Sequence, residues 1–262
     1  MLKILELFAG VGGFRVGLER ANKNFFVTHW SNQWEPTRKA QHAFNCYNAH
    51  FTDSININRD ISTIQNTEIA KFDADMIVGG FPCQDYSVAR SLKGEMGIKG
   101  KKGTLFWEII RFTKIIQPKI IQPKYIILEN VDRLLKSPAS QRGRDFGIML
   151  SAFNNLGYAV EGRVVNAADY GMAQRRRRVF LFIYKNNTNI FQKFSQQTQE
   201  NLIYKNGIFA KAFPVEKTAS KNRVQRFEIN PDYTVPLCQD KFFKYDNGLL
   251  QGSENMWVLS RV

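Results

Sequence analysis

The chain has few of the residues that build disulfide frameworks and metal sites. Its three cysteines, Cys46, Cys83 and Cys238, are an odd number and lie far apart. This pattern argues against a disulfide framework and predicts a reducing, cytoplasmic environment. The three histidines show no metal-ligand spacing with cysteine or carboxylate residues, so we expect no metal.

Long apolar runs and acidic residues are also scarce. No run approaches membrane length, and the first residues lead directly into a short strand instead of the apolar core of a signal peptide. The sequence has 23 Asp plus Glu against 37 Lys plus Arg, a formal charge of +14. Such a surface attracts phosphates, which supports a nucleic-acid partner without identifying one.

What is present is an alternation of strand and helix signals. Short apolar runs separated by helical patterns predict a layered α/β domain, and 262 residues suffice for one sizeable core and a smaller appendage. The expected strands cover residues 3–7, 25–28, 76–78, 125–128 and 179–184, and the expected helices cover 14–22, 36–49, 104–116 and 145–156.

Three of the predicted strands end in unusual residues. A glycine loop, Phe8-Ala9-Gly10-Val11-Gly12-Gly13, follows the first strand, Cys83 follows the strand at 76–78, and Glu129 follows the strand at 125–128. If these strands are parallel, their carboxyl ends meet along one edge of the sheet, where ligands bind. Taken singly, Cys83 could be a buried structural thiol and Glu129 a carboxylate satisfied by backbone donors.

The glycine loop departs from the dinucleotide-binding pattern. Gly10 and Gly12 fit Gly-x-Gly-x-x-Gly, but Arg15 stands where the third glycine should be, which weakens a nicotinamide assignment. The glycines still allow close approach of the backbone to a ligand, and the start of the following helix favours an anion. S-adenosylmethionine, which has a carboxylate, would suit this loop; a ligand-free turn is the alternative.

Four motifs in order resemble the DNA cytosine-5 methyltransferase family. They are the glycine loop at 8–13, Gly80-Phe81-Pro82-Cys83-Gln84, Glu129-Asn130-Val131 and Gln174-Arg175-Arg176-Arg177-Arg178. The resemblance covers residues from about 3 to 184. It implies a Rossmann-like, S-adenosylmethionine-dependent catalytic domain over 1–184 and the start of an incomplete target-recognition region over 185–262.

Methylation of cytosine carbon 5 requires a nucleophile at carbon 6 and an acid at ring nitrogen 3. A thiolate is suited to the first role, and a carboxyl group whose pKa is raised by burial is suited to the second. The chemistry and the resemblance both assign Cys83 as the nucleophile and Glu129 as the group facing nitrogen 3.

The arginine run at 175–178 precedes a strand, so alternate side chains should face opposite ways. The resemblance places Arg176 and Arg178 in the catalytic cleft, whereas a solvated basic patch is the alternative. The predicted DNA contacts are Gln84, Ser87, Asn130, Arg175 and Arg177. Asn130 could equally be a capping residue.

Further cofactor contacts follow from the resemblance. Trp34 fits an aromatic residue that packs on adenine, whereas the acidic ribose-binding position aligns better with Gln33 than with Glu35. Asp60 would accept from the adenine amino group, or it could cap a helix. The predicted cofactor-binding residues are Phe8, Gly10, Gly12, Gly13, Trp34, Glu35, Asp60, Ile61 and Pro82.

The polar segments at 186–189 and 196–201 mark a boundary, after which the family's closing Gly-Asn-Ser type motif has no counterpart. The resemblance therefore predicts the catalytic part of a prokaryotic restriction-modification enzyme acting on double-stranded DNA in the nucleoid, with a second polypeptide carrying the missing motifs, or a truncated enzyme. A tRNA cytosine-5 methyltransferase and a non-catalytic DNA-binding remnant are alternatives, and a nicotinamide enzyme fits least.

Overall fold

The computed structural model describes residues 1–82, 105–116, 123–137, 143–215, 222–225 and 256–261. Its chain forms two compact units, one made of residues 1–82 and 104–128 and the other of residues 83–103 and 129–262. The strand at Tyr125–Val131 begins in the first unit and ends in the second. The predicted boundary near residue 184 falls inside the second unit.

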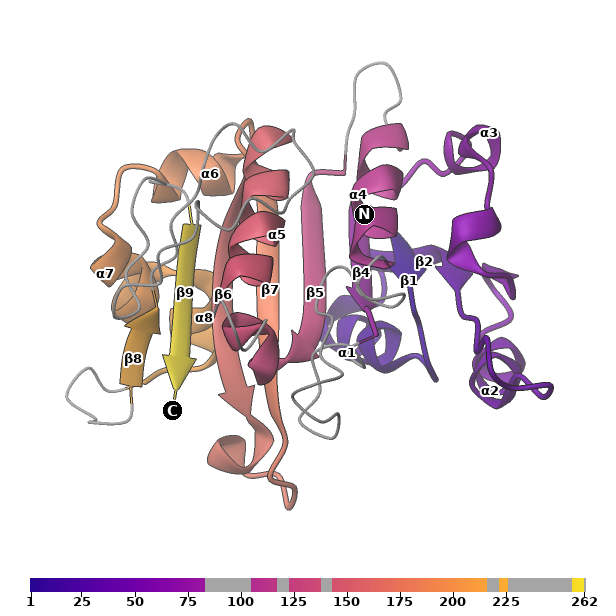
Figure 1. Ribbon diagram of the computed structural model, residues 1–262, viewed down its shortest axis with the longest axis horizontal. Coiled ribbons are helices and arrows are strands. Elements are labelled where there is room, and N and C mark those ends of the chain that lie inside the picture. The colour runs from indigo at the N-terminus through magenta and orange to yellow at the C-terminus, as the bar shows by residue number, and fades with distance from the viewer. Residues whose placement is uncertain (83–104, 117–122, 138–142, 216–221, 226–255, 262) are drawn as a thin grey trace. The chain divides into compact units, whose positions relative to one another are not determined.

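The first unit alternates strands and helices around a parallel sheet (Figure 1). Parallel pairing joins β1 to β2 and to β4, and β2 to β3, in the order β3-β2-β1-β4-β5. The elements are β1 Leu2–Leu7, α1 Gly13–Asn22, β2 Phe26–Asn32, α2 His42–His50, β3 Ile55–Ile57, η1 Ile61–Thr63, α3 Asn66–Ile69, β4 Met76–Gly80, α4 Leu105–Ile115 and β5 Tyr125–Val131. The predicted α/β fold is thereby confirmed.

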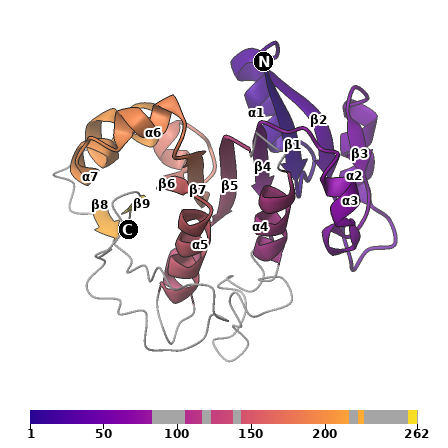
Figure 2. The same ribbon diagram turned by 90° about the horizontal axis from the view of Figure 1, so that it is seen from above.

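Helices cover both faces of this sheet, with α1 and α4 on opposite sides of β1 and β4 (Figure 2). Ile4, Met76 and Val78 form a buried cluster, against which Phe14 and Leu18 of α1 pack. Strands covered on both faces are buried along most of their length, which explains their continuous apolar runs. The register pairs Leu5 of β1 with Ile77 of β4 and aligns the carboxyl ends of the two strands.

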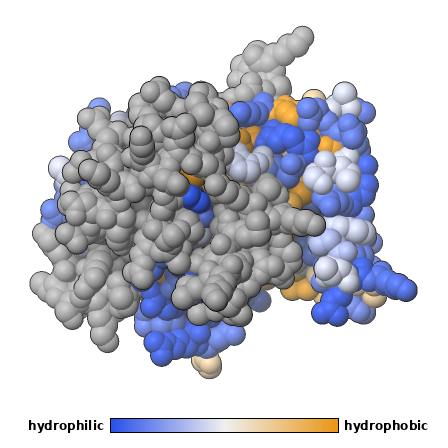
Figure 3. All heavy atoms as spheres, in the orientation of Figure 1, coloured by the Kyte–Doolittle hydropathy of each residue, from blue (hydrophilic) through white to orange (hydrophobic). Residues whose placement is uncertain are grey.

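The second unit has a mixed sheet in the order β7-β6-β9-β8. β6 is antiparallel to β7 and parallel to β9, and β9 is antiparallel to β8. The elements are η4 Asp132–Lys136, α5 Arg144–Asn155, β6 Tyr158–Asn166, η6 Ala167–Tyr170, β7 Arg177–Lys185, α6 Asn189–Phe194, α7 Gln199–Asn201, η7 Leu202–Asn206, α8 Ile208–Ala212, β8 Asn222–Gln225 and β9 Met256–Arg261. On the face drawn in Figure 3 the described surface is mostly hydrophilic.

Two buried charges on β6 anchor the segment that follows α6. The Glu161 carboxylate accepts hydrogen bonds from the backbone N–H groups of Ile208 and Phe209 at 3.0 and 2.7 Å, where α8 begins. Arg163 donates to the carbonyls of Ile203 and Phe213. The acid therefore lies at the amino end of the helix and the base at its carboxyl end, the arrangement that the helix dipole favours.

One predicted helix begins later than expected. Residues 36–41 form a loop, and α2 begins at His42 instead of near 36. The Gln41 side chain closes this loop, accepting from the Glu35 N–H at 2.8 Å and donating to the carbonyls of Glu35 and Arg38, both at 2.9 Å. These bonds replace those that a first helical turn would have made.

We expect Gly79→Ala to destabilise the first unit by about 1–3 kcal/mol, because a methyl group there would lie 2.6 Å from the Leu7 carbonyl oxygen of the neighbouring strand. Gly17→Ala on the exposed side of α1 meets no atom within 4 Å and should stabilise by about 0.5–1 kcal/mol through helix propensity. Urea denaturation of both variants measures the difference. Equal effects would contradict the close approach of β1 and β4.

Candidate active site

The loop between β1 and α1 has an unusual backbone. Phe8 has a φ of 55°, and Gly10 and Gly12 have φ values of 59° and 92°. A bulky residue in the left-handed region is strained and is often found at a functional site. A side chain at Gly12 would collide with the Phe51 ring, whereas nothing lies within 4 Å of the position of a Cβ at Gly10. The loop is therefore packed against the Phe51 ring at Gly12, whereas the space beside Gly10 is open.

The end of β2 supplies polar and aromatic side chains beside this loop. The Gln33 side-chain oxygen accepts from the Gly10 N–H at 2.8 Å, so Gln33 lies directly at the glycine loop. Glu35 instead accepts from the Ala43 N–H at 3.3 Å, near the start of α2. Trp34 is 38% exposed, which leaves its ring available to a ligand. The contacts thus place Gln33, not Glu35, beside the predicted cofactor loop.

The turn after β3 presents Asp60. Its carboxylate caps η1, accepting from the Ser62 N–H at 2.9 Å and from the Ser62 hydroxyl at 2.7 Å. Ile61 is buried. The capping role that the sequence allowed is therefore present, and the proposed adenine contact stays a prediction. Pro82, at the end of β4, is half-buried and is the last described residue before residue 105.

A buried acid lies in β1, the strand that leads into the glycine loop. Glu6 of β1 is fully buried and accepts from the Tyr47 hydroxyl at 2.9 Å, while its other oxygen has no partner among the described residues. Burial raises the pKa of Glu6 to about 7, against the smaller lowering effect of the Tyr47 hydrogen bond. The sequence did not reveal this group, because an acid in mid-strand gives no motif.

Arg15, which breaks the dinucleotide pattern, is almost fully buried in α1. Its guanidinium lies over the Phe51 ring at 4.2 Å, bonds Glu19 at 2.6 Å and Ser54 at 2.7 Å, and pairs with Asp53. It therefore ties α1 to the segment before β3, a role that explains why glycine is absent here.

In the second unit, Glu129 forms an ion pair with Arg178. The Nε atom of Arg178 lies 2.7 Å from a Glu129 oxygen, and the two side chains are 24% and 23% exposed. Burial raises the pKa of the Glu129 carboxyl, while the nearby charges of Arg178 and Arg176 lower it. The arrangement brings together three of the four predicted catalytic residues.

The neighbouring arginines have different surroundings. Arg177 pairs with Asp132 at 2.9 Å, and Arg175 and Arg176 are exposed. Asn130 is buried, and its side-chain oxygen accepts from the Val131 N–H at 2.8 Å. The cap position of η4 is Val131 and not Asn130, and the DNA contact of Asn130 stays a prediction. Of the other predicted residues, Cys83, Gln84 and Ser87 lie outside the described residues.

Two negative findings apply to the part of the chain that the structure describes. There, no three His, Cys, Asp or Glu side chains come together as a metal site would require. In the same residues, no helix combines the length and apolar character needed to cross a bilayer.

Comparison with known proteins identifies the family. The family model for the C-5 cytosine-specific DNA methylase matches residues 2–252. The chain belongs to this family. The resemblance seen in the sequence is confirmed.

Several curated relatives are named as type II methyltransferases. The type II methyltransferase M.Sau3AI of Staphylococcus aureus is 56% identical, over 98% of this chain and 61% of the relative. M.NgoBI of Neisseria gonorrhoeae is 35% identical, over 71% of this chain and 52% of the relative. The chain thus spans about three fifths of the length of M.Sau3AI and about half that of M.NgoBI.

The fold of the chain also resembles a solved structure. The S. pombe Dnmt2 methyltransferase matches with a TM-score of 0.54 and 21% identity, over 73% of this chain and 54% of that one. At this identity the match concerns the fold alone, and it agrees with the α/β arrangement described above.

We expect Glu6→Gln to change how stability depends on pH. Folding raises the pKa of the buried Glu6 carboxyl from 4.5 to about 7, so the folded state binds the proton more tightly than the unfolded state does. The folded state is therefore least stable when this carboxyl is ionised. Wild-type stability should therefore fall, relative to Glu6→Gln, as the pH rises from about 4.5 to above 7, by up to about 3 kcal/mol. Urea denaturation at pH 5 and pH 8 measures the difference.

Glu68→Gln is the matched control for this experiment. Arg59 and the Gln65 N–H lower the pKa of the exposed Glu68, so this variant should gain no stability at pH 8. A difference between wild type and Glu6→Gln that stays constant with pH would show that Glu6 does not titrate in this range.

Proposed function

We propose that the chain transfers a methyl group from S-adenosylmethionine to carbon 5 of cytosine in double-stranded DNA, in a restriction-modification system. The observation that carries the proposal is the half-buried Glu129–Arg178 pair, in a chain of the cytosine-specific DNA methylase family. The names of its curated relatives, type II methyltransferases, support the restriction-modification setting.

The residues of the first unit fit the cofactor. Gly10 is open to close approach, the strained Phe8 lies at the end of β1, and the exposed Trp34 ring offers a flat apolar face. Gln33 would bind the ribose through its amide N–H₂, because its oxygen is already bonded to the Gly10 N–H. When bound, S-adenosylmethionine supplies an electrophilic methyl group.

The chain's own residues would perform the remaining chemistry. The Cys83 thiolate adds to carbon 6, forming an S–C bond, while Glu129 protonates or hydrogen-bonds ring nitrogen 3. Once carbon 5 carries the methyl group, its remaining hydrogen leaves as a proton to water. The electrons of that C–H bond re-form the double bond between carbons 5 and 6, and the S–C bond breaks to return the Cys83 thiolate. Because burial raises the pKa of Glu129, a larger fraction of its carboxyl groups carries the proton that this role needs.

The arginines have separate proposed roles. Arg178 holds the Glu129 carboxyl at 2.7 Å and would also bond the cytosine carbonyl, with Arg176 beside it. Exposed Arg175, together with Arg177, would contact phosphates, which position DNA without reading its sequence. Since carbon 6 is unreachable in a stacked duplex, the cytosine must be flipped out.

The chain spans 61% of the length of M.Sau3AI, so the activity is proposed for the chain together with the part of the family that it does not span. We propose that turnover also requires the part of the family that the chain does not span, supplied as further sequence or by a second polypeptide. Base readout would depend on that part, since sequence is read by contacts to base edges.

We expect Cys83→Ser to abolish methyl transfer while leaving cofactor binding nearly intact, because the variant lacks the thiolate that adds to carbon 6. The wild-type chain, together with the further sequence or second polypeptide that turnover requires, should form a denaturant-resistant adduct with duplex DNA containing 5-fluorocytosine. Denaturing gels detect the adduct. Transfer of a tritiated methyl group is measured with duplex DNA and with tRNA as substrates.

Cys46→Ser is the matched control, because Cys46 is an exposed free thiol of the first unit. An adduct that survives in Cys83→Ser would refute the nucleophile. Transfer to tRNA in place of DNA would favour the tRNA alternative.

We expect Gln33→Leu to weaken binding of S-adenosylhomocysteine by roughly tenfold, because the variant loses the polar group beside the ribose. Gln33→Glu should bind at least as well as wild type, since a carboxylate can accept from both the Gly10 N–H and a ribose hydroxyl. Glu35→Gln should change little, because Glu35 bonds the start of α2. Calorimetry measures all three, and a larger loss in Glu35→Gln than in Gln33→Leu would assign the ribose to Glu35.

A further inference from the structure

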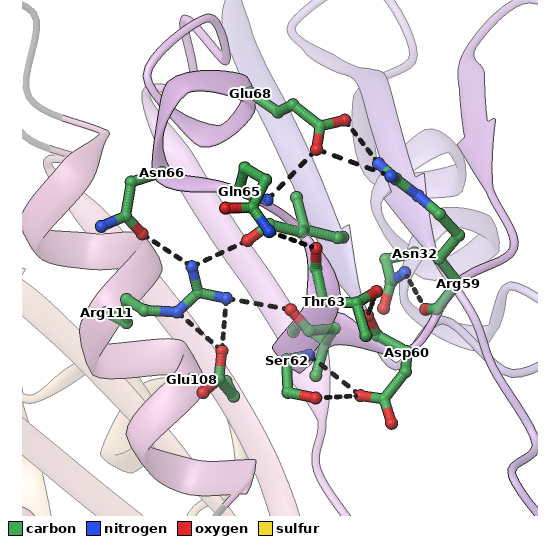
Figure 4. A network of polar contacts seen from close by, with 12 residues as sticks. Asn32, Arg59, Asp60, Ser62, Thr63, Gln65, Asn66, Glu68, Glu108 and Arg111 are labelled. Atoms are coloured by element: carbon green, nitrogen blue, oxygen red, sulfur yellow. Dashed lines mark hydrogen bonds and ion pairs between the residues drawn. The ribbon is translucent and has the colours of Figure 1, made fainter.

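Arg111 of α4 joins its own helix to the turn that follows β3 and to the start of α3 (Figure 4). Its Nη1 donates to the Ile64 carbonyl at 2.9 Å and to the Asn66 side chain at 2.8 Å. Its Nη2 donates to the Ile61 carbonyl at 2.9 Å and lies 2.5 Å from Glu108, to which Nε also donates at 2.7 Å. These contacts occupy all five N–H donors of the side chain.

The turn bonded in this way is η1, which is too short to hold its own shape. It has three residues, and one of its closing bonds, from the Ile64 N–H to the Ile61 carbonyl, is long at 3.3 Å. A single helical turn is marginal without outside contacts, and 3₁₀ hydrogen bonds have poor geometry. Arg111 bonds the Ile61 and Ile64 carbonyls, so it clamps both ends of the turn.

Asp60 is the N-cap residue of this turn. One oxygen of its carboxylate accepts both Ser62 bonds, and Figure 4 shows the other oxygen pointing away from the network. Among the described residues no hydrogen bond is made to that second oxygen. Its direction depends on η1, because Asp60 is the cap of that turn.

We propose that Arg111 is a positioning residue that holds the Asp60 turn in the geometry needed to recognise the exocyclic amino group of adenine. The inference rests on the proposed cofactor and adds to it a residue that acts through Asp60. Arg111 lies 51 positions along the chain from Asp60, on another element. Within the described residues it bonds the turn through the Ile61 and Ile64 carbonyls and the following helix through Asn66.

Lysine cannot replace Arg111 in this role. An ammonium group is a single point donor on a flexible stem, whereas the planar guanidinium fork bonds two carbonyls and a carboxylate at once. The site should nevertheless tolerate substitution, because Arg111 and Glu108 line an open hollow of about 380 Å³ and truncation would widen that hollow without leaving a sealed cavity.

The test compares two ligands, S-adenosylhomocysteine and S-inosylhomocysteine. In the second, an oxygen replaces the adenine amino group and ring nitrogen 1 carries a proton in place of a lone pair. Calorimetry on the whole chain gives both affinities. Wild type should prefer the adenine ligand by roughly tenfold or more, the effect of losing one hydrogen bond to a charged acceptor and placing an oxygen against it. Arg111→Met should reduce this preference to below about threefold, chiefly by weakening the adenine ligand.

Two further variants complete the experiment. Arg111→Lys keeps the charge beside Glu108 and the aliphatic stem, so it should fold as wild type does and still lose the preference. Arg59→Met is the matched control. Among the described residues the Arg59 side chain pairs with Glu68 alone, at 2.5 Å, and bonds neither carbonyl of the turn. It should retain the full preference.

Four results would each overturn the inference. An unchanged preference in Arg111→Met and Arg111→Lys, or an equal weakening of both ligands, would show that Arg111 only stabilises the fold. If wild type binds neither ligand, both the proposed cofactor and this inference are wrong. Binding of both ligands with equal affinity would refute the adenine recognition and leave the cofactor assignment in place.

Discussion

A charged side chain that leaves water must find partners, and this constraint fixes two of the connecting segments described here. Arg15 ties α1 to the segment before β3, and Arg163 and Glu161 hold α8 on β6. Removing one partner of such a group leaves an uncompensated charge, which costs far more than an exposed pair contributes. The apolar strands form the sheet, and the buried charges decide where the connecting segments lie on it.

The sequence predicted the elements with strong local signals. The glycine loop, the strand at 76–78 and the helices α1, α4 and α5 follow from apolar periodicity and glycine punctuation. β6 was missed, because Glu161, Gly162 and Arg163 interrupt its apolar pattern. The side chains of Glu161 and Arg163 are buried and bond backbone groups 40 to 50 residues away, and a local pattern does not include such partners.

The candidate site was only partly predictable for the same reason. Motif order identified Glu129 and the arginine run, but it did not decide between Gln33 and Glu35, which lie two positions apart after β2. The difference arises from two distant groups, since the Gly10 N–H bonds one side chain and the start of α2 bonds the other. The late start of α2 has the same origin in the Gln41 side chain.

The arginine run shows how strand geometry and chain direction combine. Alternation along β7 sends Arg177 and Arg178 to opposite faces, yet both meet a carboxylate, because β5 ends at Val131 and the chain turns into η4 at Asp132. The Arg177–Asp132 pair is 34% exposed on each side, and pairs of this kind contribute only about 0–1 kcal/mol. In the phosphate-binding role proposed for Arg177, a DNA phosphate would therefore displace Asp132 at small cost. Arg178 and Glu129 are less exposed, so their pairing should persist when the DNA backbone approaches.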